Sequence, residues 1–142
     1  MVAKIIKLVM EIINEKPPFY QKILDAGLVP SETTIFTYGD KIYNPSGAEL
    51  SNDIIVHEET HYDQQGDDPD AWWKKYLTDA SFRLEQEAEA YGEQYRFICK
   101  TTMRDREKRN GILLVLAYHL CGPMYGKIIT HMEAYKLIKK KS

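Results

Sequence analysis

Cysteine is scarce in this chain, and long hydrophobic runs are missing from it. The two cysteines, Cys99 and Cys121, lie far apart and form no C-x-x-C pattern. This excludes a framework of several disulfides, and we expect two reduced thiols in a cytoplasmic protein. No segment reaches the roughly eighteen consecutive apolar residues of a transmembrane helix, so we expect no membrane partner.

A strong charge of either sign is also lacking. The chain has 19 Lys and Arg against 21 Asp and Glu, a formal net charge of -2. This balance gives no electrostatic reason to expect a nucleic-acid partner or an anionic membrane. The one basic run, Lys139-Lys140-Lys141, follows a helical pattern, and cations at that end of a helix interact favourably with its dipole.

The N-terminal stretch lacks the features of a signal peptide. Its longest uninterrupted apolar run is Leu8-Val9-Met10, and no small-residue cleavage site follows. Its β-branched apolar residues instead recur at helical spacing: Ile5, Ile6, Val9, Ile12 and Ile13. We therefore predict an amphipathic helix that ends before Pro17-Pro18, and no targeting segment.

Turn residues and apolar periodicity divide the chain into a short hairpin and several helices. Residues 33–38 and 41–43 are rich in β-branched and aromatic side chains, and Gly39-Asp40 between them is typical of a hairpin turn. Helical patterns cover the segments 19–26, about 53–65, 71–77, 80–105, 112–120 and 130–139. We predict a single domain over residues 1–142 of the α+β class, predominantly helical, with a small β-hairpin or sheet before the first long helix.

Capping residues mark several of the predicted helix boundaries. Ser51, Asn52 or Asp53 is expected to cap the helix that follows the hairpin, and Asp70 the next one. Gly111 is expected to interrupt the helical pattern before residue 112.

One motif on these helices carries chemistry: His57-Glu58-Glu59-Thr60-His61, the spacing H-E-x-x-H. Two histidines four residues apart lie on one face of a helix, where both can bind a single Zn²⁺. The adjacent Glu58 then acts as general base on the zinc-activated water. The pattern would arise by chance in a shuffled chain of this composition with a probability of roughly one in a hundred. The motif alone is therefore weak evidence, and a zinc site is indicated only if the neighbouring elements supply a third ligand.

A dense acidic segment, Leu84 to Tyr91, is the best source of that ligand, because a catalytic zinc site has three protein ligands and a water. The predicted buried stripe of this helix consists of Leu84, Ala88, Tyr91, Tyr95 and Ile98. Glu87 lies about 60° from the centre of the stripe and Glu85 about 100° away. An inward-facing carboxylate is expected to meet a cation, so Glu87 is favoured and Glu85 remains the alternative.

With these residues the chain resembles the gluzincin clan of zinc metallopeptidases, and in particular compact minigluzincin-like members and small phage-type metallopeptidases. The segment Glu87-Ala88-Glu89-Ala90-Tyr91 matches an E-x-x-A pattern found around the third ligand in several such families, and Glu85-Gln86-Glu87-Ala88 matches it as well. The resemblance runs from about residue 42 to residue 126. It implies a zincin-like domain that hydrolyses peptide or protein substrates, with one Zn²⁺ held by His57, His61 and Glu87 and with Glu58 as the base.

The resemblance also raises two expectations about the cleft. Larger relatives carry a helical domain that closes over the substrate, so here the cleft is expected to be shallow or covered by the Trp72–Trp73 segment. Aromatic residues at that spacing usually belong to a core or a lid. A donor that stabilises the developing oxyanion is expected among five residues: Tyr91, Tyr118, His119, Tyr125 and His131.

Two rival hypotheses stand beside the peptidase. The first is a zinc-binding interaction or accessory protein of phage type, with weak or vestigial peptidase activity. The second is a metal-free helical protein whose two histidines face solvent. The presence of Glu58 beside the ligands favours the enzyme, since a purely structural zinc site needs no base.

Overall fold

A three-stranded sheet lies beneath the helix that carries the H-E-x-x-H motif. The computed structural model describes residues 10–101 and 105–142. Its strands are β1 (Glu11–Ile13), β2 (Phe36–Tyr38) and β3 (Lys41–Tyr43), in the order β1-β3-β2. Strands β2 and β3 are antiparallel and confirm the predicted hairpin, whereas β1 pairs with β3 in parallel.

Strand β1 contradicts the predicted N-terminal helix. The first nine residues of that prediction lie outside the described part of the chain, but Glu11–Ile13 is a strand, so the helix prediction is wrong there. The cause is a partner distant in sequence. Glu11 N donates to Asp40 O at 2.9 Å and Asn44 N donates to Ile13 O at 2.8 Å, a parallel ladder that β-branched isoleucines fit well.

The rest of the described chain is mainly helical, as predicted. The helices are α1 (Tyr20–Asp25), α2 (Asn52–Gln65), α3 (Pro69–Thr78), α4 (Ala80–Thr101), α5 (Arg106–Leu120) and α6 (His131–Lys141), with a 3-10 turn, η1 (Pro123–Tyr125), between the last two. Among the described residues, no helix is both long and apolar enough to cross a membrane.

Two helix boundaries differ from the prediction. Asp68, rather than Asp70, caps α3, because its carboxylate accepts a backbone N–H of the first turn. Gly111 does not interrupt a helix but lies inside α5, which begins after Asp105 and is capped by that side chain. Helix α4 is described as far as Thr101 and Asp105 is not helical, so the predicted helix 80–105 does not reach its expected end. Helix α5 begins at Arg106, so the helix predicted over 112–120 is longer than expected.

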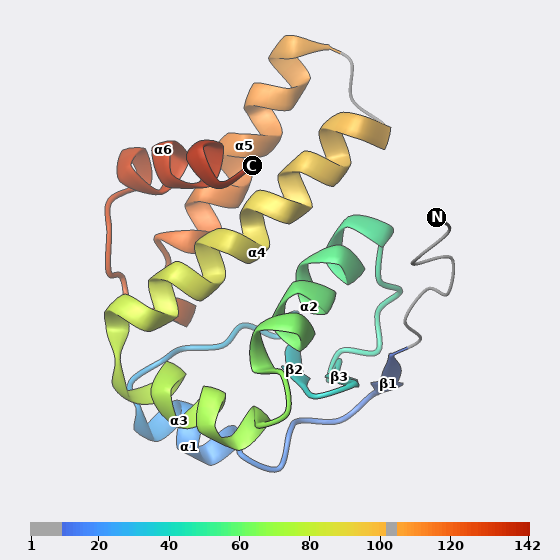
Figure 1. Cartoon of the computed structure of the whole chain (residues 1–142), viewed down its shortest axis with the longest axis vertical. Coiled ribbons are helices and arrows are strands. Elements are labelled where there is room, and N and C mark those ends of the chain that lie inside the picture. The colour runs from blue at the N-terminus through green and yellow to red at the C-terminus, as the bar shows by residue number, and fades with distance from the viewer. Residues whose placement is uncertain (1–9, 102–104) are drawn as a thin grey trace.

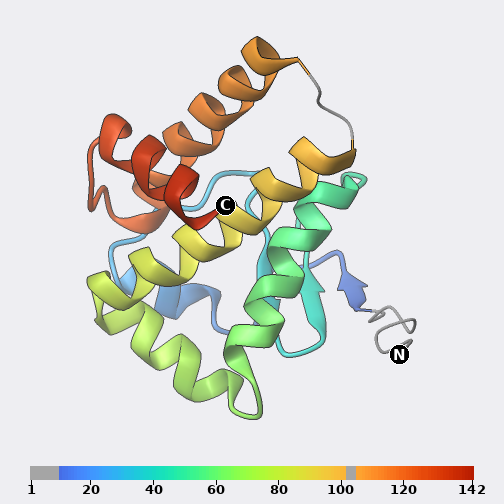
Figure 2. The same cartoon turned by 45° about the horizontal axis from the view of Figure 1, so that its top comes forward.

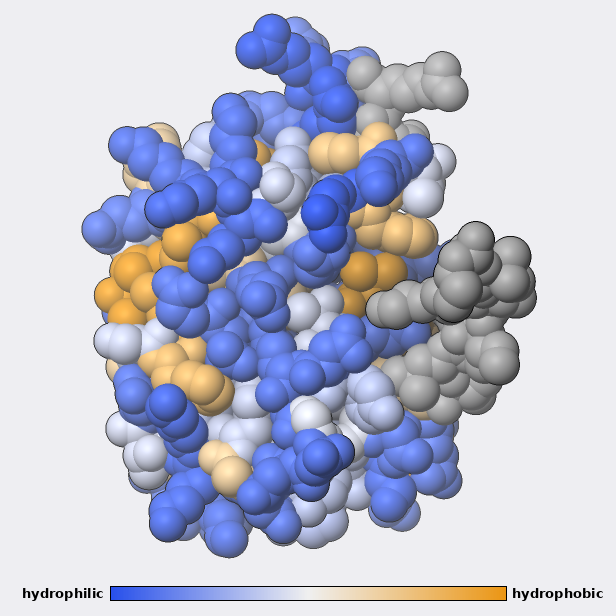
Figure 3. Space-filling model, viewed as in Figure 1, coloured by the Kyte–Doolittle hydropathy of each residue, from blue (hydrophilic) through white to orange (hydrophobic). Residues whose placement is uncertain are grey.

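Helix α4 is the central element of the fold. In Figures 1 and 2 it runs diagonally, with α2 along one side and α5 and α6 on the other. Gly92 allows α6 to approach closely, because a Cβ at this position would lie 2.8 Å from the Cβ of Lys141. On the face seen in Figure 3, hydrophilic residues cover most of the surface and apolar residues form small separate groups.

The described residues form two apolar cores, and neither contains a residue of α2. One joins α4, α5 and α6 through Ala88, Tyr91, Leu113, Leu116, Ala117, Leu120, Ala134 and Ile138. The other joins α1, the sheet and α3 through Ile23, Leu28, Phe36, Tyr43, Trp72, Trp73 and Tyr76. The buried residues of α2 itself are all polar: His57, Glu58, His61 and Gln65. A helix that buries only polar groups needs partners for each of them, which makes this face the place to look for a site.

Candidate metal centre

Helix α2 brings His57 and His61 together, as their spacing predicts. One helical turn separates them, and their Nε2 atoms lie 3.2 Å apart. The two residues are only 6% and 5% exposed. Both imidazoles therefore meet away from bulk solvent, with the same ring nitrogen directed to one point.

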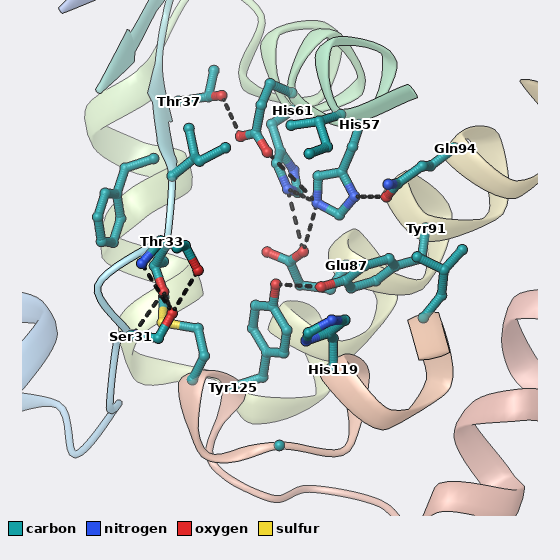
Figure 4. A pocket seen from close by; sticks show the side chains of 18 of the residues that line it. Ser31, Thr33, Thr37, His57, His61, Glu87, Tyr91, Gln94, His119 and Tyr125 are labelled. Carbon is teal, nitrogen blue, oxygen red and sulfur yellow. Dashed lines mark hydrogen bonds and ion pairs between the residues drawn. The ribbon is translucent and has the colours of Figure 1, made fainter. Parts of the chain in front are cut away.

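Glu87 of α4 completes a triangle with these two nitrogens (Figure 4). Its Oε1 lies 3.2 Å from His57 Nε2 and 3.3 Å from His61 Nε2, and the residue is 4% exposed. Glu85, the alternative ligand, lies at the surface and pairs with Lys141 Nζ at 2.9 Å. Of the two candidate carboxylates, the structure brings Glu87 to the histidines and not Glu85.

The triangle has the dimensions that a tetrahedral zinc ion requires. Zinc binds nitrogen and oxygen ligands at about 2.0–2.1 Å, and tetrahedral angles then place ligand atoms roughly 3.3 Å from one another. The three observed separations are 3.2, 3.2 and 3.3 Å. His57, His61 and Glu87 could therefore hold one metal ion, and three ligands leave a fourth position for water.

The pKa values of His61 and Glu87 depend strongly on each other's charge. Burial opposes a positive charge on His61, but the Glu87 carboxylate outweighs it and raises the pKa of His61 to about 9. Burial likewise opposes ionisation of Glu87, yet the two imidazoles lower its pKa well below the usual range. The metal-free site thus contains an ionised carboxylate that attracts a cation, either a proton on His61 or a metal ion.

Gln94 of α4 orients the first histidine. Its Oε1 accepts from His57 Nδ1 at 3.0 Å, while its Nε2 donates to Asp53 Oδ2 at 2.9 Å. Because a carbonyl oxygen only accepts, this bond puts the His57 proton on Nδ1 and leaves the Nε2 lone pair free. Gln94 lies seven residues, about two helical turns, after Glu87, and no motif in the sequence singles it out.

Gln64 does the same for the second histidine. Its Oε1 accepts from His61 Nδ1 at 2.8 Å. Its amide nitrogen donates to Gln86 O and to Glu89 Oε1, both at 2.9 Å. Each of the two histidines is therefore held by a glutamine that a second group holds in turn, and in their neutral form both imidazoles direct the Nε2 lone pair to the same point.

Tyr76 of α3 holds the other oxygen of the candidate carboxylate ligand. Its hydroxyl donates to Glu87 Oε2 at 2.6 Å. Burial, together with the negative charge of Glu87, raises the pKa of Tyr76 well above its usual value, so the hydroxyl stays a donor. The spacing of its aromatic residues predicts that the Trp72–Trp73 segment belongs to a core or a lid. Trp72 and Trp73 are indeed buried in the second core, but the role of Tyr76 was missed.

Glu58 lies beside the triangle without belonging to it. Its Oε2 is 3.9 Å from His57 Nε2, and its Oε1 accepts from the hydroxyl of Thr37 at 2.7 Å. Thr37 comes from β2, so the sheet positions this carboxylate (Figure 4). Sequence analysis found Glu58 from the motif, but nothing in the hairpin pattern singled out Thr37.

A cleft of about 710 Å³ opens over the site. A space of this size is typical of small-ligand sites, and the buried Trp72 and Trp73 are among the residues that line it. Four of the five residues considered as donors line it: Tyr91, Tyr118, His119 and Tyr125. His131 is not among the lining residues, and its Nε2 bonds to Leu114 O at 2.9 Å.

Tyr91 and Tyr125 form a hydroxyl pair at the cleft. Their oxygens lie 2.8 Å apart, and the ring of Tyr91 packs edge-on against His57. Burial raises the pKa of both tyrosines, so they remain protonated at neutral pH. In Figure 4 the hydroxyl of Tyr125 points toward the triangle from the opposite wall.

Comparisons with models of protein families, with curated proteins and with solved structures find no match to this chain. The gluzincin resemblance therefore depends on the residues and geometry described above.

Proposed function

We propose that this protein is a zinc-dependent peptidase of the gluzincin type, with a zincin-like domain. The observation that carries the proposal is the triangle of His57, His61 and Glu87 with Glu58 beside it. Each of these four residues is buried at the base of an open cleft, and three of them have the spacing of zinc ligands.

The open, three-ligand arrangement supports an enzyme over a binding module with a structural zinc ion. Structural sites are closed by four protein ligands, whereas catalytic sites keep one position for water or substrate. Here the neighbouring carboxylate, Glu58, is held aside by Thr37 at 2.7 Å. Burying an acid next to the ligands costs free energy and adds nothing to metal binding, so a role in proton transfer accounts for it better.

Each residue of the site has its own role in the proposed reaction. His57, His61 and Glu87 would hold the zinc ion, which when bound would supply a Lewis acid and lower the pKa of a water molecule. Glu58 accepts a proton from the attacking water and delivers it to the leaving amine. Thr37 keeps the carboxylate in the orientation that this transfer requires. Tyr125, supported by the hydroxyl of Tyr91, donates to the oxygen of the carbonyl as negative charge develops there.

Loss of activity in Glu58→Gln tests this proposal directly. The protein is purified without chelator, its zinc content is measured, and it is incubated with a mixed peptide library. We expect about one zinc per chain and new peptide ends that appear with the wild type and not with Glu58→Gln. Glu59→Gln, on the same helix, is the matched control and should cleave like the wild type. A zinc content near zero, or products that Glu58→Gln forms equally well, would contradict the proposal.

A further inference from the structure

Strand β2 is one of the two outer strands of the sheet, and its free edge lines the cleft. The ladder between β1 and β3 shows which groups face this edge. Glu11 N donates to Asp40 O and Asn44 N donates to Ile13 O, so the even-numbered residues of β3 bond to β1. The odd-numbered residues of β3 consequently bond to β2.

The main-chain groups of Thr37 therefore point away from β3. In the antiparallel pairing, Phe36 and Tyr38 lie opposite those odd-numbered residues and face β3. Thr37 between them, and Ile35 by the same alternation, direct N–H and C=O to the free edge of the sheet. Such a free edge can hold an extended peptide by main-chain hydrogen bonds.

The side chain of Gln65 already occupies part of this edge. Its Nε2 donates to Thr37 O at 2.7 Å, and its Oε1 accepts from Gly39 N at 2.7 Å. The indole of Trp73 donates to the same Thr37 carbonyl at 2.9 Å. The side-chain amide of Gln65 thus supplies the donor and the acceptor that the peptide group of a neighbouring strand would supply. The edge is thus filled from the carbonyl of Thr37 onward.

The start of α3 covers the same end of the hairpin. Tyr38 donates from its hydroxyl to Asp70 Oδ1 at 2.8 Å. A Cβ at Gly39, in the turn, would lie 3.7 Å from Pro69 Cγ, which is van der Waals contact. An added strand therefore has no space to continue past the turn.

The closed end of the edge coincides with the proposed general base. Thr37 is the last residue with a main-chain group on the open edge, and its hydroxyl holds Glu58 at 2.7 Å. In the other direction, residues 31 and 33–36 line the cleft. A peptide paired with the open part of β2 extends from Glu58 in that direction only.

We infer that this site acts near the end of a peptide chain: main-chain pairing holds the substrate on one side of the scissile bond, and Gln65 with the start of α3 closes the other side. This inference depends on the proposed peptidase function. It narrows the substrate class to short peptides and chain termini, because the interior of a long chain would have to continue past Glu58 on the side that Gln65 and the start of α3 fill.

Peptides blocked at one or both ends by fusion to a folded domain test the inference. The zinc-loaded protein is incubated with them and the products are mapped by mass spectrometry. We expect cleavage a constant, short distance from one particular terminus, and no cleavage when that terminus is blocked. Cleavage inside peptides blocked at both ends would overturn the inference and leave the proposed function standing. If no peptide is cleaved at all, both fail.

Proline at the free edge tests the main-chain pairing separately. Ile35→Pro removes an N–H on the free edge of the sheet and spares the β2–β3 ladder. We expect kcat/KM to fall about tenfold, as for the loss of one hydrogen bond, with zinc content unchanged. Ile12→Pro removes an N–H at the opposite edge of the same sheet and is the matched control. Equal activity of the two variants would overturn the role of the β2 edge.

Discussion

The hydroxyl of Tyr76 donates a 2.6 Å hydrogen bond to one oxygen of Glu87, and the other oxygen of the same carboxylate faces His57 and His61. The two oxygens of the Glu87 carboxylate therefore have different roles. One oxygen anchors the side chain to α3, and the other remains available to a metal ion.

Tyr76→Phe tests this anchor. The substitution keeps the ring in the second core and removes only the donor. We expect zinc affinity to fall by about tenfold to a hundredfold, the usual effect of losing a group that orients a ligand. Competition with a chromogenic chelator measures it. Tyr38→Phe, which loses only the bond to Asp70, is the control and should bind zinc as the wild type does.

The choice of third ligand is tested by a pair of neighbouring variants. Glu87→Ala should weaken zinc binding by more than about a hundredfold, because a binding free energy of roughly 10–16 kcal/mol is shared among few ligands. Glu85→Ala loses only the surface pair with Lys141 and should keep its zinc. Metal content after dialysis separates them. Equal retention by both variants would refute the assignment of Glu87.

Tyr125→Phe tests the donor to the developing oxyanion. We expect kcat to fall by about a hundredfold to a thousandfold, the usual effect of removing one such donor, while KM and zinc content change little. Tyr118→Phe serves as the comparison, since Tyr118 lines the same cleft but the residue is 68% exposed. A larger loss of kcat in Tyr118→Phe than in Tyr125→Phe would contradict our assignment.

The stability of the metal-free protein should depend on pH through His61. Its pKa is raised from 6.5 to about 9 in the folded state. The interaction with Glu87 is therefore fully present below pH 6.5 and is lost as the pH rises through about 9. We expect the free energy of unfolding in urea with chelator to fall over this range by up to about 3 kcal/mol.

Two comparisons identify the source of that pH dependence. Glu87→Gln removes the charge that raises the pKa of His61, so its free energy of unfolding should vary less between pH 6.5 and 9. In the zinc-loaded wild type the imidazoles bind metal in their neutral form, and the decline should disappear. A metal-free wild type that is equally stable at pH 6.5 and 9.5 would contradict the coupling between His61 and Glu87.

Local geometry is what the sequence by itself determined. The separation of His57 and His61 follows from one helical turn, and the hairpin follows from Gly39-Asp40 between two β-prone runs. The inward direction of Glu87 followed from its angle to the apolar stripe of its own helix. These features depend on neighbours within a few residues, so periodicity and turn chemistry are enough to predict them.

Tertiary packing decided everything that joins distant segments. The parallel pairing of β1 with β3 replaced a predicted helix, because isoleucines at residues 12 and 13 suit either structure and only a strand elsewhere in the chain selects one. Thr37 reaches Glu58 and Tyr76 reaches Glu87 because β2 and α3 pack around α2. The same packing fills the β2 edge with Gln65, a contact between residues 28 positions apart that no local pattern encodes.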